Sequence, residues 1–463
     1  MITLVRRSHQ FLDLFDNMTR ALVFFACWIA FFSHAYGQGQ PDDALTLNEV
    51  LSIGMDQNPI LLQYKNQESI VGNQVKANLS GWFPEIMVDG DYMRYFSQPT
   101  AIFPDFNNPE SGQFQEVRTG IPFNSSLNFS VNQQLVNNEL IRSQHQASSL
   151  RKQAAQSLED FKIELVNQLT VTFYEALLAQ EQVQLTQEDI RRQEKQLEDA
   201  KLMYETGIAD QIDYKRALIN LQNSQSALYQ YREETKIKSA RLNSLMGYPK
   251  ERDLELTASF EELLDEIVLD TLQQPAAGNR IEYQLLETRS VIQQAEIRYQ
   301  KRKFIPTLSA FYNYNILYLS PVGNELFDQG YPFSLIGVRL NYPLFQGGRR
   351  IFELREAALQ LDNLELEQKD FSNQIQADHQ EALSRYKNQL YLFNIQERNK
   401  KLAEEIYEIV SLQYEEGIKN FLEVIVAETD LRVSRINYTR SLFAVLTSKL
   451  AVQRARGEVI TDY

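Results

Sequence analysis

Four short segments of the chain alternate between apolar and polar residues. Residues 123–132, "FNSSLNFSVN", set Phe, Leu and Val on one side and Asn and Ser on the other. The stretches 307–318 ("TLSAFYNYNILY") and 334–342 ("SLIGVRLNY") behave in the same way, and 85–95 does so more weakly. A period of two is typical of a strand with one apolar and one polar face. We predict strands at about 84–97, 122–133, 306–318 and 333–343.

Two very long helical stretches accompany these strands. Neither proline nor glycine occurs from Val136 to Met203 or from Arg349 to Glu416. Apolar or small residues then recur at alternating spacings of four and three, which is typical of coiled-coil packing. These positions are Ala217, Leu221, Ser224, Leu228 and Tyr231, and Val424, Ala427, Leu431, Ser434, Tyr438, Leu442 and Val445. We predict long helical hairpins over 136–248 and 347–456, with tips near 204–210 and 414–420.

Several phrases of the sequence occur twice along the chain. "YETGIADQIDYKRALINL" (204–221) corresponds to "YEEGIKNFLEVIVAETDL" (414–431). "GWFPEIMVDGDY" (81–92) corresponds to "KFIPTLSAFYNY" (303–314), and "VNQQLVNNEL" (131–140) to "LNYPLFQGGR" (340–349). Such self-similarity indicates a tandem duplication. We predict one repeat over 38–248 and a second over 279–457, joined by a linker at 249–278 and followed by a tail at 458–463.

The duplicated phrase predicts a turn between two helices. Gly207 and Gly417 would each end one helix with a positive φ. Asp210 and Asn420 stand where the next helix needs an N-cap.

The N-terminal segment reads as an export signal. An arginine precedes an apolar run from Ala21 to Phe32, and small residues follow at Ala35 and Gly37. This order predicts a cleaved signal peptide over 1–37, with Met1 or Met18 as the start. The alternative is a membrane anchor, although the run is short for about 30 Å of hydrocarbon. Cys27, the only cysteine, lies mid-way through the run, which is a poor place for lipidation.

Composition argues against enzymatic and nucleic-acid-binding classes. The formal net charge of −15 disfavours a phosphate-binding face. His145 and His379 lack acidic or histidine partners at ligand spacing, and no phosphate loop or Gly-x-Ser-x-Gly nucleophile occurs. We therefore expect no enzyme, no cofactor, no bound metal and no nucleic acid. Carboxylates on long amphipathic helices are expected to form solvated faces. The acidic charge balance would also suit a water-filled conduit lined with carboxylates, which favours cations or neutral solutes.

Four strands cannot close a barrel, and an open edge in lipid leaves backbone groups unpaired. Bacterial barrels have an even number of strands, at least eight, so two copies would give eight and three would give twelve. Aromatic residues gather where helix meets strand, as expected of an interfacial belt. They are Trp82, Phe83, Phe304, Tyr342 and Phe345. The alternative is a soluble sandwich with one wet face.

Together these features resemble the TolC-like outer-membrane efflux proteins across nearly the whole mature length. The motifs that carry the resemblance are "LNYPLFQGGRR" (340–350), Pro84, Pro306 and the paired Tyr-Glu-x-Gly-Ile turns. The resemblance implies a mostly α fold with a membrane β-barrel, in which each protomer gives four strands to a trimeric twelve-stranded barrel. A long α-helical coiled-coil tunnel would continue it into the periplasm.

The resemblance also implies partners and a passive transport function. A homotrimer would sit in outer-membrane lipid and meet a periplasmic adaptor (membrane fusion) protein and an inner-membrane efflux transporter. It would conduct solutes outward in efflux or type I secretion. The alternatives are a non-transporting periplasmic coiled-coil protein and a substrate-specific outer-membrane porin. Loops at 97–121 and 319–332 are expected to face outside the cell.

Candidate site residues are carried over from the family by position. Glu423 would form an acidic ring at the periplasmic gate, with Asp213 as its counterpart in the first repeat; alternatively, it is only a favourable charge in a helix's first turn. Val426 stands where the family often has a second acid, which suggests an apolar constriction below one ring. The tip residues expected to contact the adaptor are Tyr204, Gly207, Ile208, Tyr414, Gly417 and Ile418. The expected barrel junctions are Pro84, Pro306 and Pro343.

Overall fold

The computed structural model describes residues 44–104, 114–207, 210–248 and 254–463. The predicted signal peptide over 1–37, including Met18 and Cys27, lies outside the described residues. Two compact units are distinguished. In the described part of the small unit, Leu45 and Leu256 form a parallel β-bridge. The large unit, which begins at Thr46, contains all the named helices and strands.

The large unit is mostly helical. Its α-helices are α2 (Leu47–Gln57), α3 (Pro59–Leu79), α4 (Asn138–Glu205), α5 (Gln211–Met246), α6 (Phe260–Asp265), α7 (Ile281–Arg302), α8 (Arg349–Glu415) and α9 (Phe421–Arg456). Its strands are β1 (Glu85–Arg94), β2 (Thr100–Pro104), β3 (Phe114–Arg118), β4 (Phe123–Val136), β5 (Thr307–Ser320) and β6 (Gly330–Asn341). Short 3-10 turns occur at Ser80–Trp82, Ala277–Asn279 and Gly323–Glu325.

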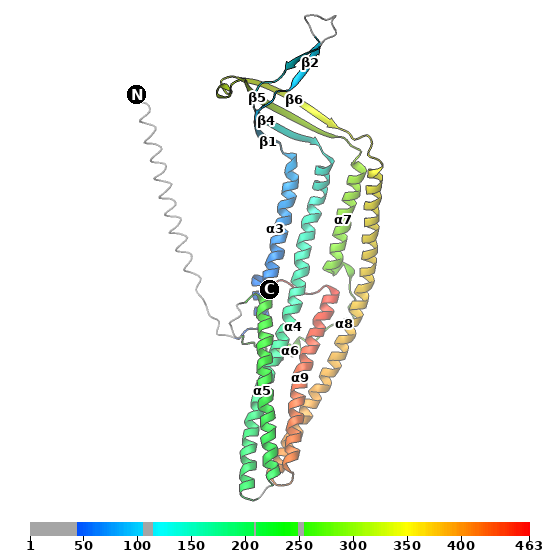
Figure 1. Ribbon diagram of the computed structural model, residues 1–463. Coiled ribbons are helices and arrows are strands. Elements are labelled where there is room, and N and C mark those ends of the chain that lie inside the picture. The colour runs from blue at the N-terminus through cyan, green and yellow to red at the C-terminus, as the bar shows by residue number, and fades with distance from the viewer. Residues whose placement is uncertain (1–43, 105–113, 208–209, 249–253) are drawn as a thin grey trace, which may run out of the picture. The chain divides into compact units, whose positions relative to one another are not determined.

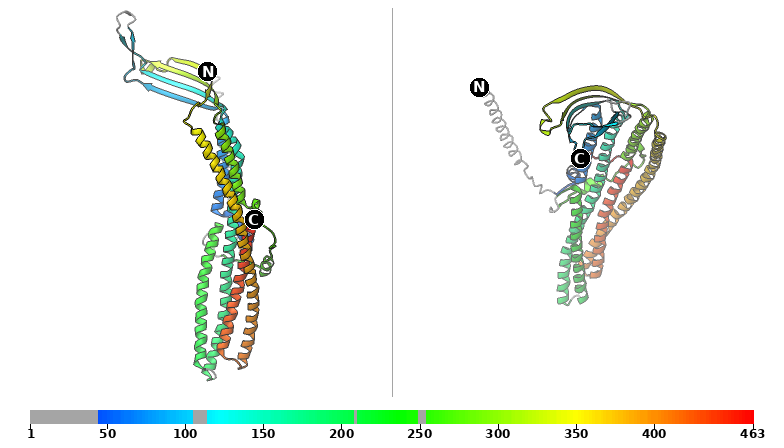
Figure 2. Two further views of the ribbon diagram at one scale, coloured as in Figure 1. Left: turned by 90° about the vertical axis from the view of Figure 1, so that its right-hand side faces the viewer. Right: turned by 45° about the horizontal axis from the view of Figure 1, so that its top comes forward.

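Two shorter helices pack, one after the other, along the length of each long helix. With 68 and 67 residues, α4 and α8 are each about 100 Å long. Near the sheet they pack against α3 and α7, and beyond these against α5 and α9 (Figures 1 and 2). The two repeats therefore have the same plan, as the duplicated sequence predicts.

In both repeats, the C-terminus of the last helix contacts the backbone just before the helix that leads into the sheet, α3 or α7. Gly247 ends α5 with φ +73°, and a Cβ there would lie 2.4 Å from the carbonyl oxygen of Gln57. Gly457 ends α9 with φ +72°, and a Cβ would lie 2.5 Å from the carbonyl oxygen of Asn279. Glycine is therefore required at both positions. The C-terminus of α5 lies against the backbone between α2 and α3, and the C-terminus of α9 lies against the backbone that precedes α7.

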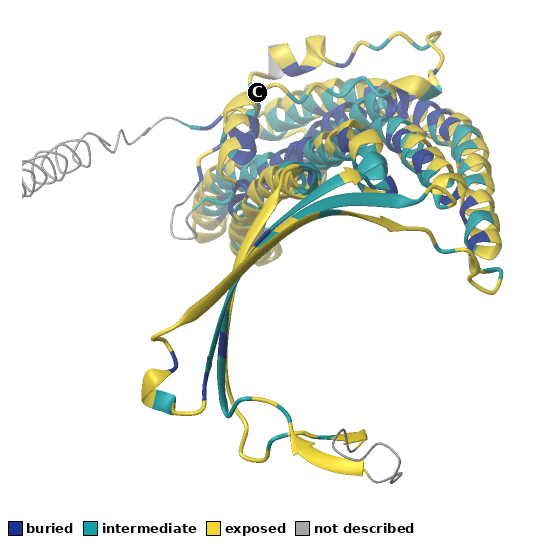
Figure 3. Cartoon of the chain, turned by 90° about the horizontal axis from the view of Figure 1, so that it is seen from above, coloured by how far each residue is buried: buried dark blue, intermediate teal, exposed yellow. Residues whose placement is uncertain are grey.

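The four long strands form one antiparallel sheet in the order β1-β4-β5-β6. Its register places the apolar positions of all four strands in common rows. One row runs Ile86, Val131, Tyr312 and Ile336. Seen from above, the sheet curves, and its outer strands β1 and β6 are exposed along their length (Figure 3). The predicted strands with one apolar and one polar face are confirmed, and the apolar face has no cover within the described chain.

Polar positions share the opposite face of the same sheet. Asp89, Asn128 and Asn315 lie in one row, which ends at the exposed Phe333 of β6. Phe311, which interrupts the polar pattern of β5, has its ring centre 5.1 Å from the guanidinium of Arg339 on the neighbouring strand. A cation over the ring makes this aromatic residue compatible with a polar face.

The segment expected to be a plain loop at 97–121 contains a hairpin. Its strands β2 and β3 pair antiparallel from Thr100 with Arg118 to Pro104 with Phe114. The matching connection in the second repeat, between β5 and β6, spans only 321–329. The inserted hairpin explains why the first repeat is longer. Residues 105–113 at its end lie outside the described residues.

Two predicted helix starts were too early. Val136 is the last residue of β4, and the helix begins at Asn138 because the Asn137 side chain accepts hydrogen bonds from the amides of Glu139 (2.9 Å) and Leu140 (3.3 Å). In the second repeat, Gly347 and Gly348 have φ of +60° and +82°, so the helix starts only at Arg349. Across the described part of the chain, no helix combines the length and apolar character needed to cross a membrane.

Part of the linker lies against the second repeat as a strap. The hydroxyl of buried Tyr386 donates to the carbonyl of Ile267 at 2.8 Å. The guanidinium of buried Arg456 donates to the carbonyl of Asp270 at 2.8 Å. These bonds from α8 and α9 satisfy main-chain carbonyls that have no helical partners.

Candidate functional site

The two Tyr-Glu-x-Gly-Ile phrases form the turns at the ends of the hairpins. Gly207 and Gly417 have φ of +78° and +75°, so the predicted left-handed glycines are confirmed. The side chain of Asp210 accepts from the amide of Ile212, and that of Asn420 accepts from the amide of Glu423, both at 3.1 Å. The predicted N-caps are therefore confirmed. Ile208, a predicted contact residue, lies outside the described residues.

The two hairpin ends pack together through a small apolar cluster. Phe421, at the start of α9, is 3% exposed and lies against Ala200 of α4 and Ala217 of α5. Tyr414 of α8 contacts this cluster, its ring centroid 5.8 Å from that of Phe421. In the first repeat, Tyr204 stacks on Tyr214 of α5 with the ring centroids 6.3 Å apart.

The polar end of Tyr414 reaches the first repeat. Its hydroxyl donates to the sulfur of Met203 at 3.7 Å. Burial raises the pKa of Tyr414, and the nearby charge of Asp213 adds to the effect. Asp213 and Tyr414, predicted separately, thus lie close together.

Glu423 lies in the first turn of α9, and its carboxylate forms an ion pair with Lys419. Its side chain is 38% exposed and accepts a hydrogen bond from Lys419. That hydrogen bond lowers the pKa of Glu423, so the carboxylate stays charged at neutral pH. Val426, one turn further along α9, is 52% exposed. The structure therefore places a carboxylate, its lysine partner and an exposed apolar residue on the same end of α9.

A second charged cluster was missed by the sequence prediction. Asp189 of α4 and Glu428 of α9 have side chains only 5% and 2% exposed. Arg192 donates to Asp189, and its Nε lies 3.6 Å from an oxygen of Glu428. Arg432 approaches Asp189 at 4.0 Å. For these two acids the expectation of solvated carboxylates is wrong, because the two hairpins pack over them.

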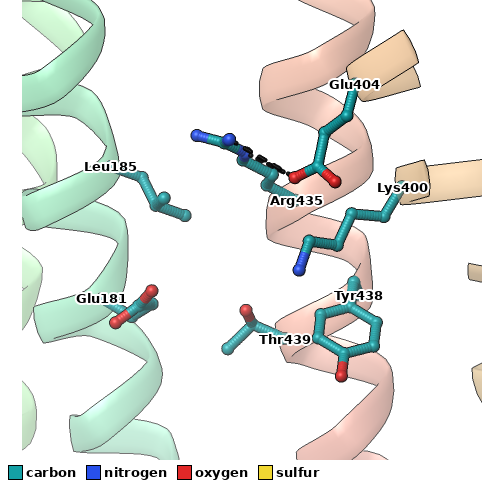
Figure 4. Close-up of a pocket in the computed structure, with 7 residues that line it drawn as sticks. All are labelled: Glu181, Leu185, Lys400, Glu404, Arg435, Tyr438 and Thr439. Carbon is teal, nitrogen blue, oxygen red and sulfur yellow. Dashed lines mark hydrogen bonds and ion pairs between the residues drawn. The ribbon is translucent and has the colours of Figure 1, made fainter. Parts of the chain in front are cut away.

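A cavity of about 310 Å³ adjoins this cluster between α4 and the α8–α9 pair (Figure 4). Arg435 binds Glu404 across one wall at 3.3 Å and also lies 3.8 Å from Glu188. Glu181 of α4 and Lys400 of α8 project into the space from opposite sides, and Lys400 lies 4.7 Å from the centre of the Tyr438 ring. Burial raises the pKa of Glu181.

The junction prolines lie beside the strands. Pro84 immediately precedes β1, Pro306 immediately precedes β5, and Pro343 follows β6 after one residue. Four of the five aromatic residues expected at this level are exposed: Phe83, Phe304, Tyr342 and Phe345 are 72%, 51%, 47% and 87% exposed. The fifth, Trp82, is half-buried.

Both histidines outside the signal region lie beside arginines. Buried His379 accepts from Nε of Arg456 at 3.3 Å, so its accepting nitrogen carries no proton. His145 lies 3.5 Å from a guanidinium nitrogen of Arg302. No group of three potential metal ligands occurs within the described ranges.

The sequence profile of the outer membrane efflux protein family matches residues 54–248 and 276–458. The chain belongs to this family. The two matched segments correspond to the two repeats, and the connection between them falls on the strap region. No match was found among curated protein sequences.

Solved outer-membrane channels share the fold of this family member. The CmeC channel of Campylobacter jejuni is 13% identical with a TM-score of 0.70, covering 91% of this chain and 90% of that one. CusC is 15% identical with a TM-score of 0.69, covering 92% and 95%. VceC of Vibrio cholerae is 14% identical with a TM-score of 0.66, covering 89% and 96%. Mostly helical architecture with a small sheet, as the sequence predicted, is common to them.

Proposed function

We propose that this efflux-family protein is the outer-membrane exit duct of a tripartite efflux or type I secretion system. The observation that carries the proposal is the sheet: its apolar face is exposed, while its opposite face is largely polar in β1, β4 and β5. Ile86, Ile336 and Val338 are 61%, 82% and 64% exposed on the apolar face. Lipid is the environment that stabilises such a face, and the exposed aromatic residues at the helix–strand junction suit the interfacial zone.

The protein forms a homotrimer with a shared twelve-stranded barrel. Strands β1 and β6 are the unpaired edges of the sheet, and the order of directions lets β6 of one copy pair antiparallel with β1 of the next. Closure in this way removes every free edge, as a membrane requires.

The helical region supports the same assembly. Phe352, Leu359 and Leu366 recur every seven residues along α8, and each is 63% exposed. Ile212, Ile219 and Tyr229 of α5 are 53%, 57% and 68% exposed. These apolar stripes suit a neighbouring copy better than water.

The N-terminal part of α9 forms the periplasmic gate. Three copies would bring three Glu423 carboxylates near one axis, each with its Lys419, and Val426 would line a narrower apolar ring. Because Lys419 offsets part of the charge, the ring is less repulsive than bare carboxylates would be. Such a ring favours cations over anions.

The turns at Tyr204–Gly207 and Tyr414–Ile418 contact a periplasmic adaptor, which is served by an inner-membrane transporter. Ile418 and Tyr204 are 70% and 39% exposed at the hairpin ends. Ile208 belongs to the same proposed contact. The protein conducts passively, without a cofactor or a catalytic step.

Reconstitution tests the proposal directly. Native mass spectrometry in detergent should give a trimer, and planar bilayers should show a cation-preferring pore. Ile336→Asp, which puts a charge on the proposed lipid face, should reduce insertion, whereas Asn341→Asp on the polar face should not. A stable monomer with its full β-sheet signal would contradict the shared barrel. Extraction of the mature protein without detergent would favour the purely periplasmic alternative.

A further inference from the structure

Two buried acids connect the hairpins of different repeats. α4 packs more extensively against its hairpin partner α5 than against any other element, and α8 does the same against α9, while α4 and α9 join the two hairpins directly. Asp189 and Glu428 lie at this joint, one on each helix. Taking a carboxylate out of water is costly unless cations and hydrogen bonds replace the water.

The available cations favour Asp189 over Glu428. Arg192 donates a hydrogen bond to Asp189, and Nε of Arg432 lies 4.0 Å from its other oxygen. Arg432 also donates to Ser224 of α5 at 3.2 Å. Among the described residues, Arg192, at 3.6 Å, is the only cation within ion-pair distance of Glu428, and Arg432 acts on it from further away. Neither oxygen of Glu428 accepts a hydrogen bond of good geometry from a described residue, although the Gln196 amide is near.

The surrounding charges do not supply the missing partner. From α4 the cluster is faced by Glu188 and Arg192, from α8 by Glu404, and from α9 by Arg432 and Arg435. Arg435 is engaged by Glu404 and Glu188, both partly exposed. Including Asp189 and Glu428, four carboxyl groups face three guanidinium groups, so one added proton makes the cluster neutral.

We propose that Asp189 and Glu428 hold one proton between them, and that this proton controls how closely α4 and α9 pack. The proton is carried mainly by Glu428, because Asp189 has the better cationic partners. When it is present, one buried carboxyl is neutral and can donate to its neighbour. When it leaves, two buried carboxylates repel across the joint between the hairpins.

The direction of the pH effect follows from linkage. Burial, with repulsion from Asp189, raises the pKa of Glu428 to about 7, above its ordinary value of 4.5, while Arg192 and Arg432 oppose the rise. Burial likewise raises the pKa of Asp189. A raised pKa in the folded state gives stability that is complete below the ordinary pKa and is lost as the pH rises through about 7. The joint is therefore tight in mild acid and loosens in mild alkali.

The neighbouring cavity, through which protons from solvent would reach the joint, is lined by Glu404 and Arg435 of this cluster. Arg435 lines that cavity and contacts Glu188, the residue next to Asp189 (Figure 4). A cavity of about 310 Å³ with several charged walls has room for water.

Infrared pH titration of the purified full-length protein tests the proton site. In the wild type, the carbonyl stretch of a protonated carboxyl group should disappear near pH 7, and Glu428→Gln should remove that component. Glu405→Gln is the matched control: it changes an exposed carboxyl on α8 that is not one of the four carboxyl groups of the cluster, and it should leave the component in place. If no carboxyl group titrates above pH 6 in the wild type, the proposal is wrong.

A second variant keeps the test open if Glu428→Gln does not fold. Asp189→Asn removes the repulsion and frees both arginines for Glu428, so the midpoint should fall toward the ordinary glutamate range. An unchanged midpoint would show that the two acids do not share a site.

The mechanical part is tested by spin labels on exposed positions of the two helices, at Glu194 of α4 and Asp430 of α9. Double electron–electron resonance in trimers diluted with unlabelled chains should give a longer distance at pH 8 than at pH 5. With Glu428→Gln, the short distance should persist at both values. A pH-dependent distance in that variant would overturn the proposal. Neither readout needs a conducting pore, so failure of the proposed transport function would not be mistaken for failure here.

Discussion

Two glycines on one hairpin allow backbone conformation and steric contact to be separated. Gly417 at the tip and Gly457 at the end of α9 have nearly equal φ, +75° and +72°. Alanine in this left-handed region costs about 1–2 kcal/mol at either position. A Cβ on Gly417 meets nothing within 4 Å, whereas on Gly457 it lies 2.5 Å from the oxygen and 2.7 Å from the carbonyl carbon of Asn279. Main-chain atoms cannot rotate away as a side chain can.

Gly457→Ala should therefore destabilise the protein by roughly 2–5 kcal/mol, the φ cost plus about 1–3 kcal/mol of overpacking. Gly417→Ala should cost only the first part. The measurement is urea unfolding of purified protein at fixed detergent, followed by helical circular dichroism. Gly247→Ala should reproduce the larger effect, because its Cβ would lie 2.4 Å from the oxygen of Gln57. Equal losses for Gly417→Ala and Gly457→Ala would refute the steric argument.

Three further predictions concern the tips, the gate and the strap. Phe421→Ala, which empties the cluster between the hairpin ends, should lower stability by about 3–5 kcal/mol in the same urea assay, while Ile418→Ala, at an exposed position, should change it little. Glu423→Ala should reduce cation selectivity and block by multivalent cations in planar bilayers; unchanged selectivity in an intact trimer would leave Glu423 only its helix-end role. Burial lowers the pKa of His379, and the charge of Arg456 adds to this. Stability should therefore fall as the pH drops below about 6.5, the ordinary histidine value, and His379→Gln should remove that dependence from thermal unfolding curves; a slope that persists would contradict the assignment.

Local pattern determined much of this protein. Alternation of apolar and polar residues identified the four long strands and their apolar faces, because a pleated strand turns successive side chains to opposite sides. The repeated Tyr-Glu-x-Gly-Ile phrase identified both turns, because a helix that reverses through a left-handed residue needs glycine there. The tandem repeat, and with it the family, follows from the order of residues alone.

Shorter elements left less of a signal. Strands β2 and β3 have five residues each and include Pro104, so no periodicity is long enough to predict the hairpin. The end of β4 was missed for a similar reason: the residues before Asn137 fit a helical pattern as well as a strand, and only the N-cap hydrogen bonds decide where the helix begins.

The buried acids were decided by tertiary structure alone. Glu428 follows the seam residue Ala427 and lies roughly 100° further round the helix, a position that is solvated in an isolated hairpin. It is buried because α4 of the other repeat packs over it, in a register set by contacts such as that between Phe421 and Ala200. Periodicity describes one helix and its nearest partner. It carries no information on which part of a second hairpin, far away in the sequence, covers the remaining face, and so the charge cluster follows from the packing of the two repeats.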